Sequence, residues 1–134
     1  MYIRNETHLS QLCIIQYDAK RIGELNYILN EDYAEIGIKI WDTSYQNNGY
    51  GKSLLKMLIN FLFTDKKINN ALSLKKIKLD TNLNNKRAQH VYEEIGFKKV
   101  ATNIDAWKDQ LGNLQSSIDY ELSRDDYKKL YGKK

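Results

Sequence analysis

The segment Gln46-Asn47-Asn48-Gly49-Tyr50-Gly51 places two glycines between a strand-like run, residues 34–41, and an amphipathic run, residues 53–63. Glycine lets the backbone turn tightly and approach a ligand, because no Cβ stands in the way. The helix expected next directs the N–H groups of its first turn and the positive end of its dipole at an anion. Residues 46–53 therefore predict a phosphate-binding segment, which we name the cradle. The alternative is a tight turn that happens to contain two glycines.

Length and composition favour one domain over residues 1–134. With 134 residues and 42% apolar residues, the chain is long enough to bury one core, and a second domain would be cramped. The start is polar, and no run approaches the roughly 18 apolar residues of a membrane span, so we expect a cytoplasmic protein. The single cysteine, Cys13, excludes a disulfide within the chain and lies in an apolar run, where a buried strand thiol is expected.

Hydrophobic periodicity predicts an α/β fold with a mixed, mostly antiparallel sheet. β-rich runs at residues 11–17, 22–29 and 33–41, with turn-like residues at 18–21 and 30–32, predict three antiparallel strands. Apolar residues at helical spacing then predict a helix over 53–64, and alternation predicts a strand over 76–81 with Ile77 and Leu79 facing inward.

The second half of the chain completes the predicted order βββ-α-β-α-ββ. Helical spacing returns over residues 85–95, with Ala88, Val91, Tyr92 and Ile95 on one face, and Gly96 stands in the helix-ending position. Strand-like runs at 97–104 and 114–122, joined by a polar loop at 105–113, predict a terminal hairpin. Ser123 is placed to cap a short last helix.

Two motifs resemble those of a known enzyme family. The pattern Gln46-x-x-Gly49-x-Gly51 after a strand, followed by Asn85-x-x-Ala88-x-x-x-Tyr92-x-x-x-Gly96-Phe97, resembles the signature segments of the GCN5-related N-acetyltransferases. The resemblance covers roughly residues 11–122. It implies that acetyl-coenzyme A is the cosubstrate, that the first segment binds its pyrophosphate through backbone amides, and that the second lines the acetyl end.

The resemblance also implies which residues hold the cosubstrate. The backbone at Ile40 and Trp41, at the end of the third predicted strand, would pair with the pantetheine arm. Asn85 either caps its helix or also hydrogen-bonds that arm, and the two roles are compatible. The implied pyrophosphate ligands are Asn47, Asn48, Gly49, Tyr50, Gly51, Lys52 and Ser53, with Lys52 adding a positive charge.

Two residues are candidates for proton transfer. Tyr92 matches the family tyrosine that protonates the departing thiolate, a task suited to a phenol that is protonated at neutral pH. From spacing alone, Tyr92 would be interpreted as a core residue. The acceptor ammonium must first lose a proton, and we name Glu35 as the candidate base; it is equally compatible with an edge-strand carboxylate facing water. Weaker candidates are Glu24, Glu31, Asp42 and ordered water.

One departure from the family affects the acceptor site. Family members usually open with a strand and two helices that wall the acceptor groove, whereas only about ten residues precede the first strong strand here. The acceptor site is then unusually open, or a partner subunit in a homodimer completes it, or the chain is a truncated form. The acceptor is expected to be a small-molecule or peptide amine whose identity the sequence does not give.

Two other functions were weighed against acetyl transfer to a primary amine. Gly51-Lys52-Ser53 ends like the phosphate loop of nucleotide triphosphatases, but position 46 would have to be glycine and is glutamine. A non-catalytic coenzyme A-binding or interaction module is the stronger rival, because such a module needs the cradle but no acceptor wall. We expect no metal, because no metal-ligand spacing is present, and no membrane partner, because no long apolar run is present. We expect no nucleic-acid partner, because the lysines occur in short pairs without interleaved aromatic residues.

Overall fold

The computed structural model describes residues 2–7, 10–40 and 49–132. The chain divides into two compact units, Met1–Ile77 and Lys78–Lys134, each of which is described by itself. The expected class, α/β with mostly antiparallel strands, is confirmed. That residues 1–134 form one domain stays a prediction.

Four antiparallel strands form the sheet of the first unit, in the order β1-β2-β3-β4. They are β1 (Tyr2–Thr7), β2 (Ser10–Tyr17), β3 (Lys20–Leu29) and β4 (Tyr33–Ile40). The last three confirm the predicted meander, with Trp41 outside the described residues. Strand β1 was not predicted, because its polar sequence Tyr-Ile-Arg-Asn-Glu-Thr gives neither an apolar run nor a clean alternation.

The turn between β2 and β3 is shorter than predicted. It consists of Asp18 and Ala19, which both have positive φ, 49° and 64°. Two such residues match the right-handed twist of a hairpin, so Lys20 and Arg21 are already in β3 rather than in the predicted turn. The sequence did not predict this two-residue turn, because alanine is not one of the residues that usually indicate left-handed backbone.

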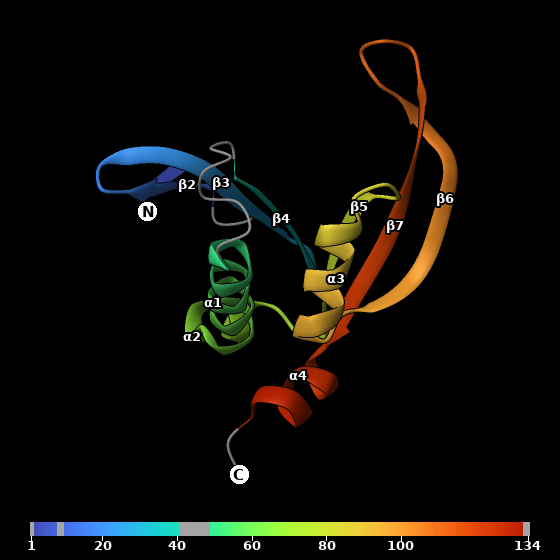
Figure 1. The fold of residues 1–134 in the computed structure, drawn as a ribbon. Coiled ribbons are helices and arrows are strands. Elements are labelled where there is room, and N and C mark those ends of the chain that lie inside the picture. The colour runs from blue at the N-terminus through green and yellow to red at the C-terminus, as the bar shows by residue number, and fades with distance from the viewer. Residues whose placement is uncertain (1, 8–9, 41–48, 133–134) are drawn as a thin grey trace. The chain divides into compact units, whose positions relative to one another are not determined.

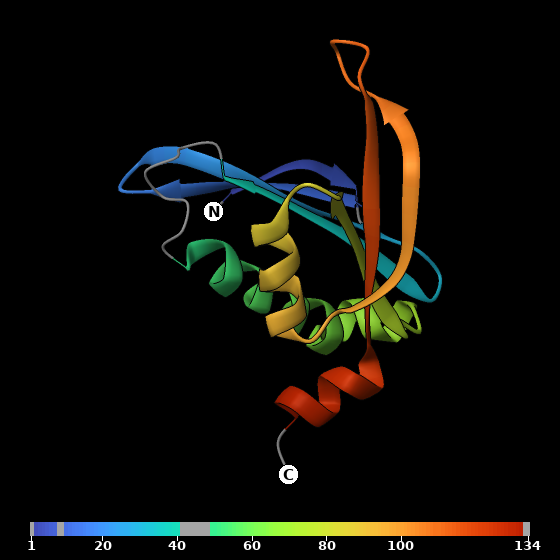
Figure 2. The same ribbon diagram turned by 45° about the vertical axis from the view of Figure 1, so that its right-hand side comes forward.

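Helix α1 (Tyr50–Thr64) covers one face of the β1–β4 sheet, as both ribbon views show (Figures 1 and 2). Side chains alternate between the two faces along a strand, and Tyr27 of β3 lies on the face that α1 covers. The centroid of its ring is 6.2 Å from that of Phe61 of α1. A second helix, α2 (Lys66–Ala71), is capped by Asp65, whose carboxylate accepts the Ile68 N–H at 3.0 Å. It buries no side chain, which explains why periodicity gave no signal for it. The apolar face of α1 buries Leu55, Leu58, Ile59, Leu62 and Phe63.

In the second unit the strand order is β5-β7-β6. Strand β5 (Lys76–Asn82), within which the chain passes from the first unit to the second, buries Ile77 and Leu79 as predicted. Helix α3 (Lys86–Ile95) follows, and Gly96 ends it with φ 125° while its N–H bonds to the Tyr92 carbonyl. Both the predicted helix and its glycine terminator are therefore confirmed.

Strands β6 (Lys98–Lys108) and β7 (Leu114–Ser123) form a long hairpin (Figure 1). The predicted first strand ended at Ile104, yet β6 continues four residues further. Asp105, at φ 51°, lies where the register of β6 shifts, so the strand bulges and then resumes pairing. Exposed apolar side chains on this hairpin include Val100, Ile104 and Trp107.

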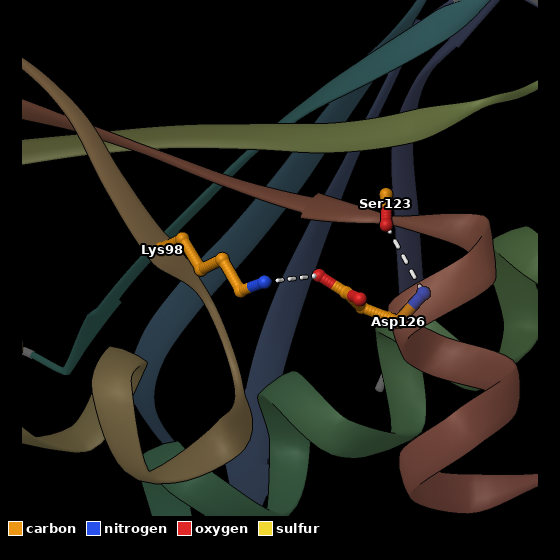
Figure 3. A network of polar contacts seen from close by, with 3 residues as sticks. All are labelled: Lys98, Ser123 and Asp126. Atoms are coloured by element: carbon orange, nitrogen blue, oxygen red, sulfur yellow. Dashed lines mark hydrogen bonds and ion pairs between the residues drawn. The ribbon is translucent and has the colours of Figure 1, made fainter.

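The predicted last helix is α4 (Arg124–Tyr131). Ser123 caps it by accepting the Asp126 N–H at 3.0 Å, and Lys98 of β6 forms an ion pair with the Asp126 carboxylate at 3.1 Å (Figure 3). The Lys98 ammonium lowers the pKa of that carboxyl. The Tyr131 hydroxyl donates to the Ile95 carbonyl at the end of α3. These contacts join α4 to both α3 and β6.

We predict that Gly96→Ala destabilises the protein more than Gly112→Ala does. Both glycines have positive φ, 125° and 82°, so each alanine meets a backbone cost of about 1–2 kcal/mol. An added Cβ at Gly96 also overlaps the end of the exposed Leu130 side chain of α4, which must then move, whereas at Gly112 it meets none of the described atoms within 4 Å. Urea unfolding of the two variants measures the difference. Equal losses would show that the Leu130 contact does not constrain the end of α3.

Candidate functional site

The cradle is described from Gly49 onward; Gln46, Asn47 and Asn48 lie outside the described residues. Gly49 is the N-cap of α1, with φ 79° and ψ 0°, and its carbonyl accepts the Ser53 N–H at 3.0 Å. The helix starts at Tyr50, three residues before the predicted start, so Tyr50, Gly51, Lys52 and Ser53 form its first turn. The periodicity that predicts a helix begins only at Leu54, which is why the first turn was missed.

The start of α1 suits an anion electrostatically. No acidic side chain lies in its first turn, and Gly49 offers no capping side chain. The helix dipole is therefore not offset locally by a carboxylate, while Lys52 adds positive charge in that turn. Among the residues that the structure describes, nothing lies within 4 Å of a Cβ built at Gly49, so this part of the chain leaves the space beside the Gly49 backbone open. These features fit a bound phosphate group.

Strand β4 carries two of the predicted residues. Glu35 is exposed, whereas its neighbours Ala34 and Ile36 are buried, so the carboxylate lies on the sheet face opposite α1. Ile40 ends the strand opposite Gly23 of β3. Five residues separate the two positions, which is about 17 Å of extended chain. Glu35 therefore lies near the start of β4, whereas the cradle follows the other end of the strand.

Tyr92 is buried on α3, within the second unit. Its ring makes edge-on contacts with Phe97, at 6.2 Å between ring centroids, and with Tyr120 of β7, at 5.7 Å. Burial first, and the negative charge of Asp80 second, raise the pKa of its phenol. The Tyr92 hydroxyl is therefore protonated at neutral pH, as an acid must be. It makes no hydrogen bond within the part of the chain that the structure describes.

Asn85 is the N-cap of α3. Its side-chain oxygen accepts the Ala88 N–H at 3.1 Å, which is the capping role predicted for it. Asn82 ends β5 and begins the loop that leads into α3. Its side-chain amide donates to Gln115 at 2.9 Å, and its side-chain oxygen accepts the Asn84 N–H at 2.8 Å. The loop that leads into α3 is thus held by side-chain amides at both of its ends.

Gln89 is a site residue that the sequence did not reveal. It is buried on the inner face of α3, and its amide donates to the Leu83 carbonyl at 2.8 Å and to the Asn82 carbonyl at 3.4 Å. The amide therefore satisfies two loop carbonyls beside the start of the helix. In the sequence, Gln89 simply follows Ala88, which lies on the predicted apolar face. From periodicity alone, Gln89 is interpreted as a polar residue at the edge of that face.

A separate apolar cavity of about 300 Å³ lies in the first unit, between α1 and the strands β2 and β3. The Cys13 thiol faces it, and burial raises the pKa of that thiol, so the predicted buried strand thiol is confirmed. The cavity is lined by Gln11, Cys13, Leu25, Tyr27, Met57, Leu58 and Phe61.

Over residues 2–7, 10–40 and 49–132, no group of three or more histidine, cysteine or carboxylate side chains is placed to hold a metal ion. None of the helices in these same ranges is long and apolar enough to cross a membrane. His90 instead pairs with Glu94 one turn later on α3, at 3.3 Å.

Comparison with known proteins identifies similar sequences and folds. A family model described as the Acetyltransferase (GNAT) family matches residues 2–97. Curated protein sequences give no significant match. Among solved structures, a probable acetyltransferase superposes with a TM-score of 0.68 at 23% identity, covering 81% of this chain and 59% of its own.

Two further structures are polyamine enzymes by name. A mutant form of the spermidine/spermine N-acetyltransferase SpeG from Vibrio cholerae gives a TM-score of 0.78 at 22% identity, over 92% of this chain and 72% of its own. A chimera of that enzyme and hSSAT gives 0.75 at 23% identity, over 90% and 72%. The chain therefore spans between about three fifths and three quarters of these neighbours, and at such identities the likeness shows the fold.

Proposed function

Because the chain belongs to the Acetyltransferase (GNAT) family, a family of acyltransferase enzymes, we propose that it transfers an acetyl group from acetyl-coenzyme A to a primary amine. The observation that carries this proposal is the start of α1. Gly49 has left-handed backbone and caps the helix, and the first turn of that helix contains no acidic side chain. This arrangement suits a bound pyrophosphate, because free N–H groups and the positive end of the helix dipole face the anion.

In this proposal the first unit binds the cosubstrate. The N–H groups of residues 49–53 hold the pyrophosphate, and Lys52 contributes charge. The pantetheine arm runs along β4 from Ile40 toward Glu35. That stretch is about 17 Å long, so the arm carries the thioester away from the cradle and toward the carboxylate. Trp41, Asn47 and Asn48 complete the proposed binding residues, and Asn85 of the second unit is proposed to contact the arm.

The proposed reaction is a direct displacement. Glu35, or a water that it binds, takes a proton from the acceptor ammonium, which frees the nitrogen lone pair. The nitrogen attacks the thioester carbonyl and forms the new C–N bond, and it then loses its second proton to solvent. The C–S bond breaks, and its electron pair leaves on sulfur. Tyr92 donates its phenolic proton to the sulfur, and solvent later returns a proton to the phenolate. Cys13 takes no part, because no covalent enzyme intermediate is needed.

The proton donation from Tyr92 to the thiolate is uphill in free energy. A phenol has a pKa of about 10 and a thiol of about 8.5, so the transfer costs about 2 kcal/mol before the environment of Tyr92 is considered. Burial raises the Tyr92 pKa and adds to that cost. In return, the hydroxyl is always protonated when a thiolate develops. The alternative, a bare thiolate leaving in a poorly solvated site, carries a larger desolvation cost.

Polyamines are the acceptors to test first, because two of the structural neighbours are named as spermidine N-acetyltransferases. A cytoplasmic location and a homodimer stay predictions. A single measurement, the release of free thiol, distinguishes the enzyme from the rival hypothesis of a non-catalytic coenzyme A-binding module. It would bind acetyl-coenzyme A and release no free thiol when mixed amines are added, whereas the enzyme releases one thiol for each amine acetylated.

We predict that Gly49→Asp weakens acetyl-coenzyme A binding at least tenfold relative to Gly49→Asn. Both residues tolerate left-handed backbone, so the fold is affected equally. Only the aspartate places a negative charge beside the pyrophosphate, and a repulsion of about 1.4 kcal/mol at that distance corresponds to tenfold in affinity. Calorimetric titration measures both dissociation constants. Equal constants would mean that Gly49 does not face the bound anion.

We predict that Tyr92→Phe lowers kcat about a hundredfold, which is a typical contribution of a general acid. The phenylalanine ring keeps the contacts with Phe97 and Tyr120, so the dissociation constant for acetyl-coenzyme A and the unfolding temperature should stay close to those of the parent. Thiol release under saturating substrates measures kcat. A variant that turns over as fast as the parent would exclude Tyr92 as the acid.

We predict that Glu35→Gln slows acetylation of an alkylamine at pH 7 by about tenfold or more, because the ammonium then lacks its base. An aromatic amine, which is neutral at that pH, should lose much less rate. Asp32→Asn is the matched control, since Asp32 is also exposed, lies in the turn before β4 and is not a candidate base. If both amines slow equally in Glu35→Gln, the residue does not act as a base.

A further inference from the structure

Tyr120 is the largest side chain that the second unit buries completely. It projects from β7 toward α3, and the two elements lie side by side in both ribbon views (Figures 1 and 2). Its hydroxyl donates a hydrogen bond to the carboxylate of Glu93 at 2.7 Å. Burial, reinforced by this carboxylate, raises the pKa of Tyr120, so the hydroxyl stays a donor throughout the working pH range.

Glu93 follows Tyr92 directly on α3, so the two side chains leave the helix about 100° apart. One tyrosine of β7 therefore contacts both of them, packing its ring edge-on against Tyr92 and holding Glu93 through its hydroxyl. Phe97 packs against Tyr92 as well. The Tyr92 hydroxyl has no hydrogen bond of its own among the described residues, so packing sets its direction, and these ring contacts are part of that packing.

We propose that Tyr120 is a positioning residue for Tyr92, and that its hydrogen bond to Glu93 fixes the turn of α3 from which the Tyr92 hydroxyl is presented. The inference rests on the proposed function, in which Tyr92 is the acid. The bond prevents α3 from rotating about its axis at this turn, and the edge-on ring contact then sets the plane of the Tyr92 phenol. A displacement of about 1 Å at a reacting group can cost up to a hundredfold in rate.

A double-mutant cycle tests the inference, because a residue that acts only through Tyr92 has nothing left to act on once the Tyr92 hydroxyl is gone. Tyr120→Phe removes one hydroxyl and keeps the buried ring. We expect it to lower kcat about tenfold in the parent and less than about twofold in the Tyr92→Phe background. The KM for acetyl-coenzyme A should not change. Glu93→Ala should behave like Tyr120→Phe, and Glu93→Gln, which keeps an accepting oxygen, should recover most of the rate.

Glu94→Ala is the control, since Glu94 is the next carboxylate on α3 and pairs with His90. It should leave kcat unchanged. A loss caused by Tyr120→Phe that is equally large with and without the Tyr92 hydroxyl would overturn the inference, because it would show a general structural effect. No loss in the parent, with a slow Tyr92→Phe enzyme, would also overturn it and would leave the proposed function intact.

A second readout does not depend on turnover. The aromatic carbon signals of Tyr92, assigned by their disappearance in Tyr92→Phe, should shift in Tyr120→Phe and stay in place in Glu94→Ala. If Tyr92→Phe is fully active, the proposed acid role fails, and this spectrum still decides whether Tyr120 sets the position of the ring. Unchanged Tyr92 signals in Tyr120→Phe would overturn the inference whatever the rates are.

Discussion

Left-handed backbone, which glycine adopts more readily than any other residue, sets the ends of both helices that carry candidate residues. Gly49, at φ 79°, starts α1 at the cradle, and Gly96, at φ 125°, ends α3 one turn after Tyr92. A side chain at either position would cost energy before any ligand is bound. The positions of the first N–H groups of α1 and of the last turn of α3 therefore both depend on a missing Cβ.

The two catalytic candidates are held in very different ways. Tyr92 lies on a helix whose preceding loop is bound by two side-chain amides: Asn82 accepts the Asn84 N–H, and Gln89 donates to the Asn82 and Leu83 carbonyls. These hydrogen bonds restrain the backbone that leads into the helix. Glu35 instead lies exposed on β4, where solvent reaches it. A buried acid needs a fixed direction, while a base that exchanges protons with water benefits from access to it.

Periodicity predicted the elements with a strong apolar pattern and missed those without one. The meander, Ile77 and the terminator Gly96 follow from patterns that the structure repeats. Strand β1 has a polar sequence without a clean alternation, and α2 buries no side chain, so periodicity predicted neither. The candidate site residues show the same difference between those that a local pattern predicts and those that it does not. Motifs pointed to the glycines and to Tyr92, but Gln89 and the Tyr120–Glu93 bond join residues 6 to 27 positions apart, and no local pattern reports such pairings.

The bulge at Asp105 has a consequence for how the protein behaves at high concentration. Strand β6 is the last strand in the order β5-β7-β6 and carries exposed Val100 and Ile104, a combination that invites pairing with a strand of another molecule. The register shift between Asn103 and Trp107 interrupts the row of outward N–H and C=O groups, so an incoming strand finds no continuous template. The irregularity thus protects the chain against fibril-like stacking without removing its apolar surface.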